Sequence, residues 1–195
     1  MTRIRRQREI IDRQELSAAL EKLAGWSGYA DSVRPKVLEI FKDTLDRGWN
    51  EIKKRFEAGE IKGPETVASH TFQIDQLIRV MYDFTLKYVY PAANPTKGEQ
   101  IAIAATGGYG RGELSPFSDI DLMFLTPYKT TPHTEQVVEF MLYSLWDLGL
   151  KVGHATRSID DAVRLARGDK TICTSLLEAR WLWGSEEVFE KFRAR

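Results

Sequence analysis

The stretch TGGYGRGELSPFSDIDLMFL, from Thr106 to Leu125, sets four glycines and an arginine before two aspartates that are one residue apart. The apolar run from Asp119 to Leu125 predicts a strand. Residues i and i+2 of a strand project to the same face, so Asp119 and Asp121 should lie side by side, with their α-carbons roughly 6.6 Å apart. Two carboxylates this close repel each other unless a cation binds them or one of them takes up a proton.

This arrangement of residues suits metal-assisted chemistry on phosphate groups. Hard oxygen ligands on a shared face favour Mg²⁺ or Mn²⁺, which can activate an attacking oxygen and stabilise a leaving one. Asp119 and Asp121 are therefore the candidate catalytic residues and metal ligands of a phosphoryl or nucleotidyl transfer. Gly107 and Gly108, directly after a predicted strand, let the backbone approach a phosphate closely. Arg111 adds a positive charge for the same phosphate.

Two commoner phosphate-binding patterns are absent from the sequence. The dinucleotide-binding pattern G-x-G-x-x-G fails because Glu113 or Ser115 stands where the third glycine belongs. A G-x-x-x-x-G-K-[ST] loop occurs nowhere in the chain, and neither does the set of protein-kinase motifs. A purely structural turn, with Arg111 on the surface and Asp119 as a cap, is the alternative to a phosphate site.

The first half of the chain has helical periodicity. Apolar residues recur every three or four positions between Arg34 and Glu60, and again from Glu65 to Tyr90. Gly63 and Pro64 separate the two runs, which predicts an antiparallel helix pair. The Pro- and Gly-containing segment 91–100 then marks the boundary between a helical segment over residues 1–95 and a second domain over residues 96–195.

The second domain has the pattern of a small mixed β-sheet flanked by helices, which makes the fold class α+β. Short apolar runs bounded by turn residues predict three strands, at Ile101–Thr106, Asp119–Leu125 and Leu150–Ser158. A helix over His133–Leu148 joins the last two strands and ends at Gly149.

The C-terminal part of the chain is expected to be helical. Ser158 should cap a short helix. An S-x-x-E capping box predicts another helix from Ser175 to Gly184, with Thr171 as an alternative cap, and a final helix is expected over residues 185–195. A polar group in this region either caps a helix or contacts a nucleotide: Thr174, Ser175, Glu178 and Arg180.

Composition excludes several classes of protein. The 28 basic and 28 acidic side chains balance, so no DNA, RNA or membrane-surface partner is expected, and no window is apolar enough to span a bilayer. Cys173 is the only cysteine, which excludes an internal disulfide and fits a cytoplasmic protein. The basic run TRIRRQR, residues 2–8, is interpreted as a solvated tail, with a phosphate-binding arm as the alternative.

The run GGYGRGELSPFSDIDL, Gly107 to Leu122, closely resembles the signature of the DNA polymerase β-like nucleotidyltransferases, a Gly-Gly or Gly-Ser turn followed by Asp-x-Asp on the next strand. Within that superfamily it is similar to the bacterial PII-protein uridylyltransferases, bifunctional enzymes that sense glutamine. Two later runs carry the same likeness, LWDLGLKVGHATRSIDD and TSLLEARWLWG. The likeness covers roughly Ile101 to Gly184 and is weaker over the N-terminal helices.

The resemblance implies transfer of UMP from UTP to a tyrosine of the small nitrogen signal protein PII, with release of pyrophosphate. It implies Mg²⁺ or Mn²⁺ at Asp119 and Asp121 and the triphosphate at Gly107 and Gly108. It also gives Ser118 an assisting role through its hydroxyl group or its backbone. Such chemistry consists mostly of positioning and charge neutralisation.

The chain departs from the family pattern on a later strand. Many polymerase β-like enzymes carry a third carboxylate there, whereas the predicted strand Leu150–Ser158 offers only His154, as a ligand, a phosphate contact or a packed side chain. Arg157 is a second candidate for binding the nucleotide, with a surface salt bridge as the alternative. Asp160 and Asp161 are expected at a helix start, where the helix dipole favours acidic residues.

Members of that family also contain an HD-type phosphohydrolase domain, which removes UMP, and ACT domains, which bind glutamine. Neither is expected within these 195 residues, so the sequence is interpreted as the N-terminal transferase module of a longer protein, without uridylyl removal or glutamine sensing. Two alternatives stay open. One is a related transferase with another target or nucleotide, such as adenylyl transfer to glutamine synthetase, and the other is a catalytically silent nucleotide-binding module.

Overall fold

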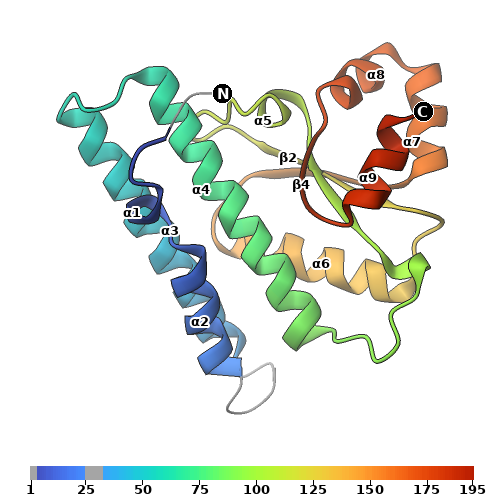
Figure 1. Cartoon of the computed structure of the whole chain (residues 1–195), viewed down its shortest axis with the longest axis horizontal. Coiled ribbons are helices and arrows are strands. Elements are labelled where there is room, and N and C mark those ends of the chain that lie inside the picture. Colours follow the sequence, from blue (N-terminus) through green and yellow to red (C-terminus); the bar gives the residue numbers. More distant parts are fainter. Residues whose placement is uncertain (1–3, 25–32) are drawn as a thin grey trace.

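A computed structural model of the chain describes residues 4–24 and 33–195. Three helices lie at one side of the molecule, and a fourth runs between them and a β-sheet (Figure 1): α1 (Gln7–Ile10), α2 (Arg13–Ala24), α3 (Arg34–Glu57) and α4 (Gly63–Phe84). A π-helical turn, Thr85–Val89, extends α4, and a 3-10 turn, Lys97–Glu99, precedes the sheet. Within the described residues, no helix has the length and apolar character needed to cross a membrane.

Helices α3 and α4 form the antiparallel pair that the sequence predicts. The link between them lies at residues 58–62, and Gly63 and Pro64 are the first residues of α4 instead of the turn itself. The apolar residues predicted to face inward along α3 are buried or half-buried apart from Phe56, which is exposed next to the buried side chain of Arg55. Mutual burial of the two stripes stabilises the pair.

The sheet is mixed, with the strand order β3-β2-β1-β4. Its strands are β1 (Ala102–Ala105), β2 (Ile120–Thr126), β3 (Val152–Ser158) and β4 (Arg180–Gly184). Strand β1 is antiparallel to β2 and to β4, whereas β2 and β3 are parallel and are joined by α6 (Pro132–Asp147). The α+β class is confirmed, and the first three strands lie where the sequence predicts them.

The fourth strand corrects the sequence analysis. The residues expected as a helix from Ser175 to Gly184 divide between the end of α8 (Lys170–Leu177) and β4, which pairs with β1. The predicted capping box does not form, because the Asp169 side chain caps α8 at the amides of Thr171 and Ile172. The aromatic run RWLW suits a strand, and its pairing with a buried neighbour outweighs the local helix signal.

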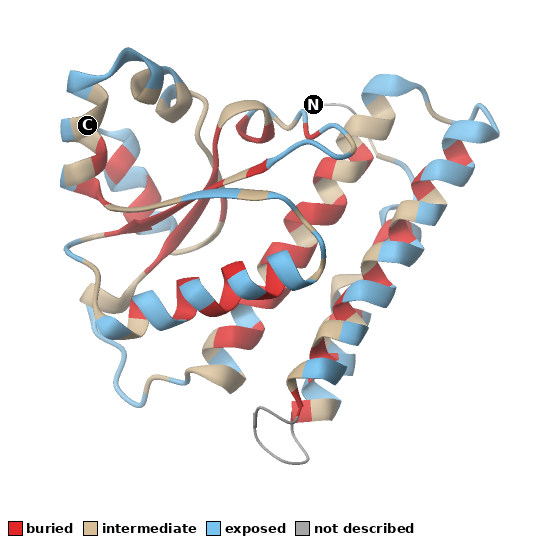
Figure 2. Ribbon diagram, turned by 180° about the vertical axis from the view of Figure 1, so that it is seen from behind, coloured by how far each residue is buried: buried red, intermediate tan, exposed pale blue. Residues whose placement is uncertain are grey.

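Helices cover both faces of the sheet. Helices α4 and α6 pack on Leu122 and Phe124, whereas α7 (Ile159–Gly168) and α9 (Glu186–Arg193) pack on Met123 and Leu125. Figure 2 shows buried residues along the sides of α4 and α6 that face inward. One hydrophobic cluster joins α1 to α4 with the first face, so the proposed boundary after residue 95 separates two sequence patterns that share a core.

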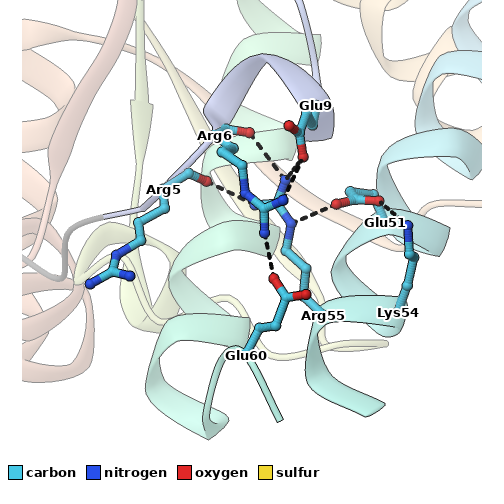
Figure 3. A network of polar contacts seen from close by, with 7 residues as sticks. All are labelled: Arg5, Arg6, Glu9, Glu51, Lys54, Arg55 and Glu60. Carbon is cyan, nitrogen blue, oxygen red and sulfur yellow. Dashed lines mark hydrogen bonds and ion pairs between the residues drawn. The ribbon is translucent and has the colours of Figure 1, made fainter. Parts of the chain in front are cut away.

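The N-terminal segment is anchored on α3 by Arg55 (Figure 3). This side chain is only 3% exposed, and its guanidinium group donates to the carbonyl oxygens of Arg5 and Arg6 at 2.8 and 3.2 Å. It also forms ion pairs with Glu9 at 2.8 Å and Glu51 at 2.7 Å. The side chains of Arg5, Arg6 and Arg8 are exposed, as expected of a solvated run, but the backbone of Arg5 and Arg6 is held on α3. The first residues of the run lie outside the described part of the chain.

Candidate functional site

Asp119 and Asp121 lie at the start of β2, on either side of Ile120. Asp119 is exposed and directly precedes the strand, whereas Asp121 is partly buried within it. Burial and the negative charge of Asp119 raise the pKa of Asp121, as expected for two carboxylates that share a site. Among the described residues, no basic side chain forms an ion pair with either carboxylate. The site therefore holds uncompensated negative charge.

Two glycines closely border Asp121. Gly107, the first residue of the short helix α5 (Gly107–Gly110), has φ +56°, and a β-carbon there would lie 3.2 Å from Asp121 Oδ2. Gly153 is the register partner of Asp121 on β3, and a β-carbon there would lie 2.8 Å from Oδ1. Position 153 is thus where a side chain of the neighbouring strand would meet Asp121, and glycine leaves that space open.

Backbone hydrogen bonds hold the glycine turn α5 together and join its first residues to β2. The amide of Thr106 donates to the carbonyl oxygen of Asp121 at 3.0 Å. The amides of Gly110 and Arg111 close the turn on Thr106 and Gly107 at 2.9 and 3.2 Å. Since the first amides of a helical turn have no acceptor within it, those of Gly107 and Gly108 can bind an anion beside the carboxylates.

Arg111 follows the turn directly. A β-carbon added at Gly108 would lie 3.6 Å from Arg111 Nη2, which places the guanidinium group beside the turn. Arg111 forms ion pairs with Glu113 at 2.9 Å and with Glu178 at 2.8 Å, and these hydrogen bonds raise its pKa. Of the polar group predicted around residue 178, Glu178 therefore pairs with the arginine that follows the turn.

Ser118 lies next to the aspartate pair, whereas His154 lies on the other face of the sheet. Ser118 directly precedes Asp119, and its hydroxyl group donates to the carbonyl oxygen of Ser115 at 2.6 Å, which closes the loop before β2. His154 is on the sheet face opposite Asp121, where its ring packs against Trp146 of α6 with 5.9 Å between the ring centroids. His154 is exposed, and this ring contact lies on the face of the sheet away from the aspartate pair.

Arg157 shares the sheet face of Asp121 but lies farther along β3. It pairs with Leu125, four residues beyond the pair formed by Asp121 and Gly153, which corresponds to roughly 13 Å along the strand. Ser158 caps α7 as predicted, because its hydroxyl oxygen accepts a hydrogen bond from the amide of Asp161 at 3.1 Å. The triphosphate candidates near Asp121 are therefore those of the glycine turn.

Sequence reasoning missed the support beneath that turn. Arg180 of β4 donates to the carbonyl oxygens of Tyr109 and Gly110, both at 3.2 Å, and pairs with Asp75 of α4 at 2.7 Å. The sequence offers one signal, because Asp75 is an acidic residue between Ile74 and Leu77 in the apolar run of α4. Its partner was not predictable, because 105 residues separate Asp75 from Arg180.

Comparison with known proteins finds a family that matches part of the chain. Residues 93–176 match the family described as "Nucleotidyltransferase domain". The chain carries a nucleotidyltransferase domain. The glycine turn and the aspartate pair both lie inside the matched residues.

Relatives of this nucleotidyltransferase domain share one name. The "bifunctional uridylyltransferase/uridylyl-removing enzyme" of Rhodospirillum rubrum is 49% identical over 99% of the chain, and that of Azospirillum brasilense is 49% identical over 96%. The enzyme of the same name from Novosphingobium aromaticivorans is 47% identical over 100% of the chain. The chain spans 20 to 21%, or about a fifth, of the length of these relatives.

The aspartate pair of the domain fits a divalent cation. Nucleotidyltransferase domains generally use divalent metals, and Mg²⁺ is commonly held by one or two carboxylates together with substrate phosphates and water. Over residues 4–24 and 33–195, no cluster of three or more His, Cys, Asp or Glu side chains could hold a metal ion. Asp119 and Asp121 are thus suited to a cation that binds together with a phosphate ligand.

Proposed function

We propose that this domain transfers UMP from UTP to a tyrosine hydroxyl group of the PII signal protein, with release of pyrophosphate. The observation that carries the proposal is the uncompensated pair Asp119 and Asp121 beside the glycine turn, which suits a cation and a triphosphate together. The names of relatives that are 47 to 49% identical support uridylyl transfer. The identity of the acceptor rests on the resemblance of the signature to PII uridylyltransferases.

The residues of the site take distinct roles in this proposal. Asp119 and Asp121 hold Mg²⁺ or Mn²⁺, which supplies positive charge to the triphosphate and to the attacking oxygen. The amides of Gly107 and Gly108 bind phosphate oxygens. Arg111 exchanges its carboxylate partners for a phosphate, because a guanidinium group binds both anions with the same bidentate geometry.

Ser118 and Arg157 have supporting places in the proposal. Ser118 closes the loop that directly precedes Asp119, through the hydrogen bond from its hydroxyl group to the Ser115 carbonyl oxygen. Arg157 is on the same sheet face as Asp121 at a distance that suits a part of the substrate beyond the phosphates. His154 packs on the other face, and the proposal does not depend on it.

The test compares the variants Asp119→Asn and Asp121→Asn with the unchanged chain in an assay with UTP, PII and Mg²⁺ or Mn²⁺. Pyrophosphate release and a UMP-sized mass gain on PII are measured. Each variant should lose at least about a hundredfold in rate, because charge stabilisation at the reacting phosphate is the main source of catalysis. Asp160→Asn is the matched control, since Asp160 is exposed on α7 and pairs with Arg195.

Three outcomes separate the alternatives. Retained transfer in both variants would rule out the assigned metal site. Incorporation from ATP in place of UTP would indicate an adenylyl transferase. Saturable, metal-dependent UTP binding without pyrophosphate release would indicate a catalytically silent module.

A further inference from the structure

Arg180 has an unusually complete set of partners beneath the glycine turn. Its Nη1 and Nη2 atoms lie 2.7 and 3.1 Å from the two carboxylate oxygens of Asp75, which is a bidentate ion pair. Its Nε atom donates to the carbonyl oxygen of Gly110, and Nη2 donates to that of Tyr109. The side chain is 23% exposed and that of Asp75 is 9% exposed. One guanidinium group therefore joins β4, α4 and the turn.

Tyr109 closes the same network. Its hydroxyl group donates to Asp75 Oδ1 at 2.8 Å, and its ring lies 5.4 Å from the guanidinium carbon of Arg180. Tyr109 is the large side chain of the turn and is 2% exposed. The turn is thus held both by its side chain and by two of its carbonyl oxygens.

Two chains of hydrogen bonds lead from Arg180 to the site. The carbonyl group and the N–H group of a trans peptide point in opposite directions. The Tyr109 carbonyl accepts from Arg180, and the N–H of the same peptide, that of Gly110, donates to the Thr106 carbonyl. The N–H on the far side of the Thr106 peptide belongs to Gly107.

The second series of hydrogen bonds runs through the next peptide of the turn. The Gly110 carbonyl accepts from Arg180, and the N–H of that peptide, which belongs to Arg111, donates to the Gly107 carbonyl. The N–H on the far side of the Gly107 peptide belongs to Gly108. Each chain therefore begins at the positive guanidinium group and ends at one of the two amides assigned to the triphosphate.

We propose that Arg180 is a positioning residue for nucleotide transfer, which aligns and polarises the amides of Gly107 and Gly108 from behind. The inference deepens the proposed function and rests on it. Hydrogen bonds in a chain strengthen one another in a low-dielectric interior, so a fixed cation at one end favours an anion at the other. Asp75 keeps the guanidinium group in place and compensates part of its charge.

The test measures binding of UTP with Mn²⁺ to the 195-residue chain by calorimetry, together with the melting temperature of each variant. Arg180→Gln should weaken triphosphate binding at least tenfold and raise KM more than it lowers kcat. Arg180→Lys should show an intermediate loss, because an ammonium group retains the charge but cannot keep all four contacts.

Arg79→Gln is the matched control. Arg79 is a half-buried arginine on α4, and its Nε atom donates to the carbonyl oxygen of Leu182 on β4 at 3.0 Å, without contacting the turn. Its substitution should lower the melting temperature and leave triphosphate affinity within twofold of the unchanged chain. A purely structural role for Arg180 predicts the same pattern for both arginines.

The outcomes for the two proposals are distinct. If the unchanged chain binds no nucleoside triphosphate, the proposed function fails and the inference fails with it. If the unchanged chain binds UTP and Arg180→Gln binds it equally well, only the inference is overturned. If Arg180→Gln does not fold, Arg180→Lys decides, and unchanged affinity in that variant overturns the inference.

Discussion

In each half of the molecule, one arginine binds the backbone carbonyl oxygens of a segment that is distant in the sequence. In the helical half, Arg55 gathers the carbonyl oxygens of Arg5 and Arg6 and pairs with two glutamates. In the sheet half, Arg180 gathers two carbonyl oxygens of the glycine turn and pairs with one aspartate. Both arginines fix a segment distant in sequence, but only the segment held by Arg180 borders the aspartate pair.

The two regions differ in whether their charged side chains are paired. Around Arg55, three cations and three anions form ion pairs with one another, while the side chain of Arg5 points away from them (Figure 3). At the site, by contrast, no basic side chain of the described residues forms an ion pair with Asp119 or Asp121, and the pKa of Asp121 is raised. A fold tolerates such a cost where a ligand later supplies the missing charge.

The largest effect on stability is expected from Arg55→Met. This change leaves Glu51 and two carbonyl oxygens without their buried partner, so the free energy of unfolding should fall by about 3–5 kcal/mol. Triphosphate affinity should not change, because Arg55 has no contact with the turn. Urea denaturation and calorimetric titration with UTP and Mn²⁺ measure the two quantities.

The control for that variant is Arg47→Met on the same helix. Arg47 pairs with Glu15 at 3.4 Å, and both side chains are about two-thirds exposed, at 66 and 68%. Such a surface pair contributes less than about 1 kcal/mol. A loss of triphosphate affinity in Arg55→Met at a temperature where it is folded would contradict the division between the two halves.

The next effect is a pH dependence that arises in the helical half. Burial lowers the pKa of His70 from 6.5 to about 4, and its ring packs 5.2 Å from that of Trp49. The unfolded chain therefore takes up the proton first as pH falls, so folding loses stability between about pH 6.5 and pH 4. The loss reaches at most about 3 kcal/mol. His70→Gln should flatten this part of the stability curve, and an unchanged curve would show that His70 is not its source.

The smallest effect is expected at the site, with the opposite sign. The raised pKa of Asp121 means that its ionised form is less favourable in the folded chain than in the unfolded one. Without metal, Asp121→Asn should therefore stabilise the fold above about pH 4, by a few tenths of a kcal/mol after allowance for solvent screening. The gain should vanish near pH 3, where the carboxyl group is protonated. Destabilisation at pH 7 without metal would contradict the assignment of uncompensated charge.

The parts of the fold predicted from sequence are those that depend on near neighbours. The strand period placed Asp121 on β2 with Asp119 directly before it, and local capping placed the start of α7 at Ser158. Strand β4 was missed because its stability comes from pairing with β1, about 80 residues earlier in the chain. A capping pattern at Ser175 and Glu178 competed with it and was locally the stronger signal.

At the site, too, features set by neighbouring residues were predictable and features set by distant contacts were not. The glycine turn and the aspartates are contiguous in sequence, so their association is readable from the motif. The open position at Gly153 depends on the register of β2 and β3, and the placement of His154 on the other face depends on the same register. The contact between Asp75 and Arg180 joins residues that are 105 positions apart in the sequence. No local pattern encodes these contacts.

The most direct test of the account is the mass of PII after incubation with this chain, UTP and Mg²⁺ or Mn²⁺. A UMP-sized gain on one tyrosine is expected, with matching pyrophosphate release, and no gain when Asp121→Asn replaces the unchanged chain. A gain of the same size with Asp121→Asn would contradict the central claim that the aspartate pair at the start of β2 is the site of transfer.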